Sequence, residues 1–133
     1  MHNNITNMII KQKPVTIKLS LILLLTGIII GAVNSIIIAF NSYYILPLPF
    51  LFLSSFFILL QIFLLNIIRK GYSTGRLVLT ILTAFGIIYS LASNVKIGTI
   101  FWIITIIDIV AIVLLYLKQS GDWFVKISNT RYR

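Results

Sequence analysis

Very few side chains of this sequence can take part in acid–base, metal or nucleophilic chemistry. The carboxylates are Asp108 and Asp122, the single histidine is His2, and the sequence contains no cysteine. Catalytic pairs, metal centres and nucleophile triads each bring several such groups together at fixed spacing. No zinc-protease, phosphate-loop or triad motif occurs in the chain. We therefore predict that the protein is not an enzyme and that it carries no metal and no cofactor.

Asp108 is the one charged side chain within the long apolar segment 99–117. A charged aspartate at the centre of a membrane helix costs about 2.5–3.5 kcal/mol on insertion scales, so we expect Asp108 to face the interior of a helix bundle. Its depth, counted from the end of the segment at Leu117, selects Gln61 and Tyr89 as polar partners on the other segments, which gives a predicted intramembrane polar cluster of these three residues. Two roles stay open for Asp108: a hydrogen-bonded structural clasp, and a proton-relay or substrate-binding group.

The composition requires that such a site lies in a lipid environment. Of the 133 residues, 59% are hydrophobic and only 10% are charged. A soluble domain has about a quarter charged residues, so a chain this apolar cannot cover a surface that faces water. We predict one integral membrane domain over residues 1–133, in contact with the lipid bilayer of a bacterial inner (cytoplasmic) membrane.

The charged residues, together with the polar and proline residues at 41–49, divide the chain into four apolar segments, each long enough to span a membrane as a helix. No charge occurs between Leu19 and Ile68, a stretch long enough for two spans. Runs such as Leu21–Leu25 are apolar on every face, which excludes the alternating pattern of a membrane β-barrel. The fold class is therefore all-α, a bundle of four transmembrane helices. The predicted helices are 19–40, 45–68, 77–94 and 99–117, followed by a basic tail, 118–133.

The lysines and arginines predict the orientation of this bundle. In the four-helix arrangement all of them except Lys96 lie on one side. Because positive residues stay in the cytoplasm, both termini and the middle turn are predicted to be cytoplasmic. The same placement, at the flanks of apolar segments, argues that the net charge of +9 holds a membrane orientation and does not bind nucleic acid. The ten cytoplasmic residues are Lys11, Lys13, Lys18, Arg69, Lys70, Arg76, Lys118, Lys126, Arg131 and Arg133.

Two further patterns predict how the helices pack and how the tail is held. Small residues recur every fourth position in the first segment, as Gly27, Gly31, Ser35 and Ala39. Such a stripe lets helix backbones approach closely, so we predict it is a packing seam, although small residues are also simply common in membrane helices. In the tail, the pair Trp123-Phe124 precedes Lys126. We predict that Trp123 and Phe124 anchor the tail at the lipid headgroups; a tail that binds a partner or senses anionic lipid is the alternative.

Several short stretches carry a resemblance to known proteins. They are 13–19, 31–36, Arg69-Lys70-Gly71 through Arg76-Leu77, and 109–115 through Trp123-Phe124. Together they resemble a widespread group of small four-span bacterial inner-membrane proteins of uncharacterised function, in which the middle turn commonly reads Gly-Lys-Asn-Trp-Ala-Arg and the chain ends soon after Trp-Phe. The resemblance implies the four-span architecture and no activity. This chain departs from that pattern at 72–75 and at Asp108, where an amide such as Gln is expected.

Three function classes remain open. The first is a structural or accessory protein that acts through a larger membrane protein or a homo-oligomer. The second is a small transporter or proton-coupled exchanger that uses Asp108; four-span drug/proton exchangers keep their acid in the first helix, where this chain has only Asn34. The third is an immunity or toxin-associated membrane protein. We expect the first class.

Overall fold

The computed structural model describes residues 12–41, 47–92 and 98–131, and over these residues the regular structure is entirely helical. This agrees with the predicted all-α class. A membrane helix satisfies all of its backbone hydrogen bonds internally, which overrides the weak helix propensity of so many β-branched residues. The helices are α2 (Val15–Asn41), α3 (Pro47–Arg69), α4 (Ser73–Ala92), α5 (Thr99–Tyr116) and α6 (Lys118–Arg131).

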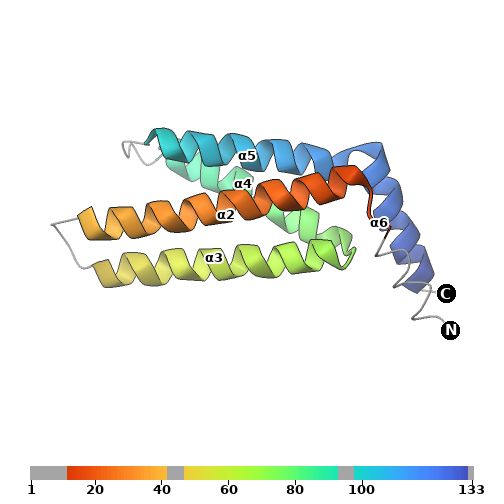
Figure 1. The fold of residues 1–133 in the computed structure, drawn as a ribbon, viewed down its shortest axis with the longest axis horizontal. Coiled ribbons are helices and arrows are strands. Elements are labelled where there is room, and N and C mark those ends of the chain that lie inside the picture. The colour runs from red at the N-terminus through yellow and green to blue at the C-terminus, as the bar shows by residue number, and fades with distance from the viewer. Residues whose placement is uncertain (1–11, 42–46, 93–97, 132–133) are drawn as a thin grey trace.

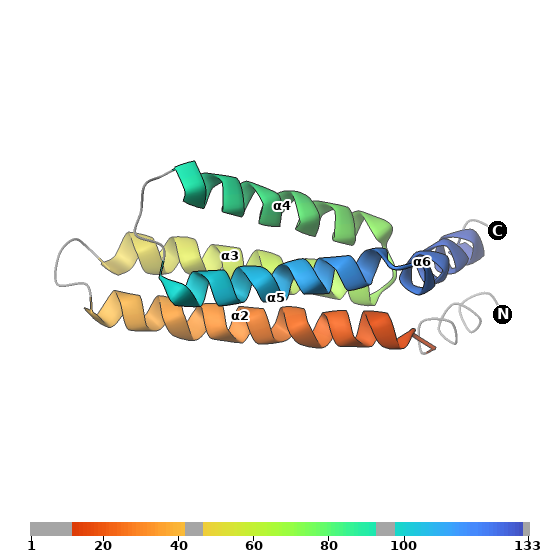
Figure 2. The same cartoon turned by 90° about the horizontal axis from the view of Figure 1, so that it is seen from above.

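Four of these helices lie side by side along the long axis of the molecule, and α6 turns away at the end where α2 begins (Figure 1). The largest contact is between α2 and α5, and α2 also packs along α3. Helix α4 contacts α3 and α5 and lies at an angle across one side of the bundle (Figure 2). The four helices therefore form a ring in which α2 and α4 each pack against both α3 and α5.

The predicted helices 45–68 and 99–117 match α3 and α5 to within two residues, but the other two begin earlier than predicted. Helix α2 begins at Val15 instead of Leu19, because the Pro14 carbonyl accepts hydrogen bonds from the backbone nitrogens of Ile17 and Lys18. Charge marks where a segment leaves the apolar region, not where its helix begins. For the same reason α4 begins at Ser73, inside the predicted polar turn.

The turn from α3 to α4 depends on Gly71. Its backbone has φ +85°, a left-handed conformation that only glycine adopts without strain. The Tyr72 nitrogen donates to the Ile67 carbonyl and the Gly71 nitrogen donates to the Ile68 carbonyl, which is the Schellman pattern that ends a helix. The chain therefore reverses direction within two residues of Arg69.

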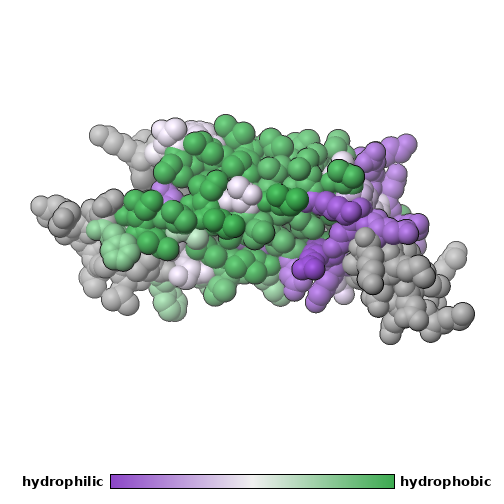
Figure 3. Space-filling model, in the orientation of Figure 1, coloured by the Kyte–Doolittle hydropathy of each residue, from purple (hydrophilic) through white to green (hydrophobic). Residues whose placement is uncertain are grey.

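Two helices are long and apolar enough to cross a membrane on the residues that the structure describes, over Val15–Ile38 and Thr99–Tyr116. The corresponding apolar stretches of α3 and α4 are shorter, at Ser54–Arg69 and Ser73–Ile88. These findings support a membrane protein, and the four-span arrangement remains a proposal. Apolar side chains cover the sides of the bundle in view, whereas hydrophilic ones gather at the end near α6 (Figure 3).

The best-packed part of the interior lies at the α6 end. Trp123 and Phe124 are only 5% and 1% exposed and pack with Ile17, Ile68 and Ile127. The prediction that Trp123 and Phe124 anchor a tail at the headgroups is therefore corrected: residues 118–131 form a helix, and both rings are buried against protein. Burial in this cluster removes the apolar area of the two rings from both water and lipid headgroups, which is favourable. The sequence of the tail alone does not show that such a cluster forms.

Candidate functional site

Asp108 lies in the middle of α5, eight residues before its last residue, Tyr116. Gln61 likewise lies eight residues before the last residue of α3, Arg69. At 1.5 Å per residue both are about 12 Å from the same end of the bundle. The two polar side chains that the sequence matched by depth are therefore at the same level on α3 and α5.

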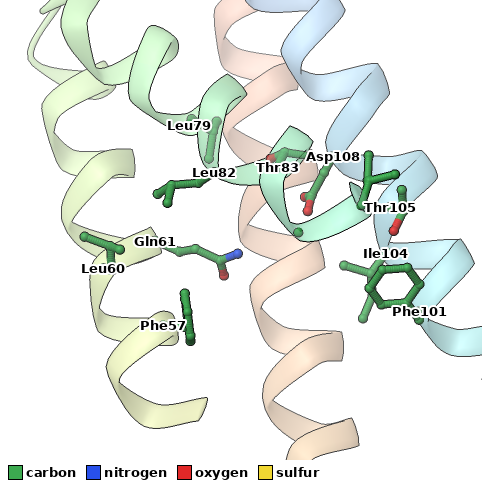
Figure 4. Close-up of a pocket in the computed structure, with 12 residues that line it drawn as sticks. Phe57, Leu60, Gln61, Leu79, Leu82, Thr83, Phe101, Ile104, Thr105 and Asp108 are labelled. Atoms are coloured by element: carbon green, nitrogen blue, oxygen red, sulfur yellow. The ribbon is translucent and has the colours of Figure 1, made fainter. Parts of the chain in front are cut away.

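Both side chains line one cavity of about 250 Å³ between α3, α4 and α5. Asp108 is half-buried, and its carboxylate points into the space toward which the amide of Gln61 also extends (Figure 4). The cavity wall adds the hydroxyls of Thr83 and Thr105 and is otherwise mainly apolar. We call this space the Asp108 cavity.

The predicted polar cluster is thus assembled only in part. Asp108 and Gln61 share the cavity wall, and they also line a smaller hollow beside Leu24. No hydrogen bond joins the two side chains in the part of the chain that the structure describes. The side chain of Tyr89, the third predicted member, lies outside the described residues, although its backbone belongs to α4.

The small-residue stripe of α2 lies against α5 where the stripe meets the site. A β-carbon built on Gly27 would come within 3.0 Å of Asp108 Oδ1, and one on Gly31 would come within 3.9 Å of Ile104 Cδ1. Ser35 continues the stripe into a groove between α2 and α3, and the side chain of Ala39 is outside the described part. The absence of a side chain at Gly27 is what allows the carboxylate to occupy this position.

Hydrogen bonds between helices fix α5, and with it Asp108, against α2. The Ser20 hydroxyl donates to the Ala111 carbonyl at 2.8 Å, and both residues are fully buried. Nearer the end, Ser120 donates to the Leu114 carbonyl at 2.7 Å and lies 2.8 Å from the Thr16 hydroxyl. Because the Ser120 hydrogen is used on Leu114, the Thr16 hydroxyl is the donor in the second pair.

The residues that the sequence analysis missed are the two threonines and two aromatic side chains of the cavity wall, Phe57 and Phe101. Thr105 could have been found, because it lies one helical turn before Asp108 and so shares its face of α5. Phe57, one turn before Gln61, and Phe101, two turns before Asp108, share the faces of those residues in the same way. Thr83 gave no such signal, because no predicted site residue with a described side chain lies on its helix. The place of Thr83 at the site depends on the angle of α4 and on its packing against α3 and α5.

The site offers one carboxylate, one amide and two hydroxyls at a shared depth, and none of the described residues that line it carries a positive charge. Such a set can bind a cationic or hydrogen-bonding group, whereas a metal site needs more ligands than one carboxylate. No protein family, curated protein or solved structure matches this chain.

Proposed function

We propose that the protein is a four-span protein of the bacterial inner membrane with both termini in the cytoplasm. The lengths support it: α3 has 23 residues and α4 has 20, and about 20 residues cross a bilayer core. Large apolar side chains are exposed along all four helices, including Ile29, Phe63, Phe85 and Ile106. A soluble protein does not expose large apolar side chains along every helix in this way. Lipid is the natural solvent for such a surface.

The absence of cysteine makes the orientation testable with single substitutions. We expect Lys96→Cys to react with a membrane-impermeant maleimide in cells whose outer surface is accessible. Ser73→Cys, at the first residue of α4, is expected to react only after lysis. Labelling of Ser73→Cys from outside in intact cells would contradict the proposed orientation.

We further propose that the protein binds a small amphipathic cation at Asp108 and moves it across the membrane, as the transporter class requires. The observation that carries this proposal is a carboxylate facing a cavity whose described wall contains no positive charge. A carboxylate without a partner is unfavourable at the depth of a membrane. Binding of a cationic ligand or of a proton compensates this cost. Phe57 and Phe101 supply ring surfaces on which an organic cation is attracted.

The chemistry of such a site couples the ligand to a proton. A neutral carboxyl group carries a proton and does not attract a cation, whereas the carboxylate attracts one. Binding of the cation to the protonated site therefore releases one proton, and charge is conserved. Release of the cation on the other side of the membrane lets the carboxylate take up a proton again, which is the cycle of a proton-coupled exchanger.

Binding of benzyltrimethylammonium to the purified protein in detergent, measured by titration calorimetry, tests this proposal. Asp108→Asn keeps the shape and hydrogen-bonding capacity of the side chain but removes its charge. We expect the substitution to weaken binding at least about tenfold, because the carboxylate is the only charge among the described residues of the cavity wall. Neopentylbenzene, the neutral analogue of the same shape, should bind equally to both proteins.

Asp122→Asn is the matched control, because it removes the other carboxylate, which lies exposed on α6. It should leave benzyltrimethylammonium binding unchanged. Equal affinity of Asp108→Asn and the unmodified protein for the cation would refute the proposal. For transport, proteoliposomes with an imposed pH gradient should accumulate the cation with the unmodified protein and not with Asp108→Asn.

The accessory class stays as a second candidate because of the groove between α2 and α3. It has a volume of about 290 Å³, and three small residues, Gly31, Ser35 and Ser54, contribute to its wall. Small residues let a further helix approach closely in lipid. We expect Ser35→Leu to release a co-purifying membrane protein if this candidate is correct, and to leave binding at Asp108 unchanged. Purification of the chain alone in mild detergent would count against it.

A further inference from the structure

A second cavity, outside the Asp108 cavity, lies at the end of the bundle where α2 begins and α3 ends. It is an open groove of about 720 Å³. The ends of α2 and α3 lie next to each other there in both views of the fold (Figures 1 and 2). Four cationic residues contribute to its wall: Lys13 and Lys18 from the α2 side, and Arg69 and Lys70 from the α3 side. We call it the basic groove.

Among the described residues that line the basic groove, all the charged ones are positive. Neither of the two carboxylates of the chain lines it, since Asp108 belongs to the Asp108 cavity and Asp122 lies on α6. Burial, followed by the nearby charges of Arg69 and Lys18, lowers the pKa of Lys13 below its ordinary value. Lys13 thus keeps its positive charge in the groove at an energetic cost, which a bound anion would relieve.

The groove is also apolar on the side that continues along α2. Leu21 and Ile22 line it, and Ile22 is 60% exposed. From these residues the exposed apolar surface of α2 runs on through Leu25 and Ile29 toward the middle of the bundle. A ligand that fits has phosphate-like charge at the level of the lysines and hydrocarbon that extends along α2. Free phosphate uses only the first of these features.

We propose that the basic groove is a binding site for an anionic phospholipid with two phosphates in its headgroup, of the cardiolipin class. Four positive charges match two phosphodiesters better than one, and leave an excess of positive charge that favours binding. Basic pockets between helices at a membrane surface recognise such headgroups. Orientation of a chain by positive residues explains why the cations lie on one side of the membrane, but not why they converge on one cavity. This inference rests on the proposed membrane placement and not on the role of Asp108.

Native mass spectrometry of the purified protein in detergent, with lipid added, tests the site. We expect one cardiolipin per chain, bound more tightly than phosphatidylglycerol and much more tightly than phosphatidylcholine. The double substitution Lys13→Gln, Arg69→Gln should weaken cardiolipin binding about twenty-five-fold, at about fivefold per positive charge near a lipid headgroup. The matched control is Lys118→Gln, Lys126→Gln, which removes two exposed positive charges from α6.

The control should weaken binding less than about threefold, because its charges are outside the groove and are screened by solvent. An equal loss in the two double variants would overturn the proposal and leave only general attraction to positive charge. Phosphatidylglycerol bound as tightly as cardiolipin would refute the two-phosphate headgroup. Displacement of cardiolipin by millimolar inorganic phosphate would show a phosphate site without a role for the acyl chains, and would also overturn it.

The groove variant is expected to fold, because its substitutions remove repulsion between positive charges. Its thermal unfolding temperature in lipid-free detergent should equal or exceed that of the unmodified protein. Added cardiolipin should raise the unfolding temperature of the unmodified protein and of the α6 control, but not that of the groove variant. A cardiolipin-dependent rise in the groove variant as large as in the unmodified protein would refute the site independently of mass spectrometry. Loss of benzyltrimethylammonium binding at Asp108 would leave all of these outcomes unchanged.

Discussion

The two halves of this bundle are packed in different ways. At the closed end, defined by Ile17, Ile68, Gly71, Phe124 and Ile127, side chains from several helices are fully or almost fully buried. Around the Asp108 cavity the described side chains are mostly half-buried, and space remains between α3, α4 and α5. In lipid, helix association gains little from the hydrophobic effect, so tight packing and hydrogen bonds hold helices together. The closed end supplies the tight packing and the hydrogen bonds, so the bundle can hold together although its middle contains a cavity.

Arg76 shows how the closed end joins its helices. Its guanidinium lies 5.0 Å from the ring centre of Tyr116 and 4.9 Å from that of Phe124, which places the cation against two aromatic rings. One of its nitrogens also lies 3.4 Å from the Leu115 carbonyl, at the end of α5 where backbone acceptors lack helical partners. The arginine that the sequence assigned to orientation therefore also links α4 to α5 and α6.

Truncation of the central ring of the closed end should have the largest effect. Phe124→Ala is expected to destabilise the protein by about 3–5 kcal/mol, because it removes a fully buried ring and leaves a cavity. Thermal or denaturant unfolding in detergent measures this loss. The neighbour Val125 is 56% exposed, so Val125→Ala should change stability by less than about 1 kcal/mol. Similar losses in the two variants would mean that the closed end is not the stabilising region.

Substitution of the turn glycine tests the same region through the backbone. Gly71→Ala places a β-carbon 2.5 Å from Ile127 Cδ1 and strains a residue at φ +85°. We expect a loss of about 2–3 kcal/mol, from the left-handed backbone and from overpacking together. Gly121→Ala is the control, since a β-carbon there meets nothing within 4 Å and lies inside a helix. It should be neutral or slightly stabilising.

A substitution on α2 should distinguish the two halves by affecting the site more than the fold. Gly27→Ala brings a methyl group to 3.0 Å from Asp108 Oδ1, so the carboxylate must move. We expect benzyltrimethylammonium binding to weaken about tenfold, with a loss of stability of about 1 kcal/mol. In the control Gly31→Ala the nearest atom is 3.9 Å away, which is ordinary contact. Equal affinity of Gly27→Ala and the unmodified protein for benzyltrimethylammonium would refute the role of Gly27 in positioning the Asp108 carboxylate.

The smallest effect is expected for the pH dependence that Lys13 gives to stability. Its pKa in the folded protein lies below the unfolded value of 10.5, so the unfolded chain binds more protons between the two values. Stability should therefore rise as the pH increases through the folded pKa toward about 10.5. Lys13→Gln lacks this rise and should be slightly more stable at neutral pH. If stability changed with pH in the same way in the two proteins, measured in lipid-free detergent, the contribution of Lys13 to the pH dependence would be refuted.

The sequence by itself determined the helical class and the approximate limits of the long helices. Composition and charge spacing suffice for this, because an apolar backbone in lipid has few alternatives to a helix. The limits of α3 and α5 and the common depth of Gln61 and Asp108 also followed from counting residues along helices. Depth depends only on the rise per residue, which is the same in every helix.

The tertiary structure alone decided which side chains meet. It buried Trp123 and Phe124 of α6 against Ile17 and Ile68, although their position before Lys126 suggested lipid headgroups. It placed Gly27 against Asp108 and Thr83 of α4 in the cavity wall. It also brought Lys13 and Lys18 together with Arg69 in one groove. These contacts depend on the rotation of each helix about its axis and on the angles between helices. Helices that are apolar on all faces carry almost no periodic signal from which rotation can be inferred, so only packing between specific side chains sets it.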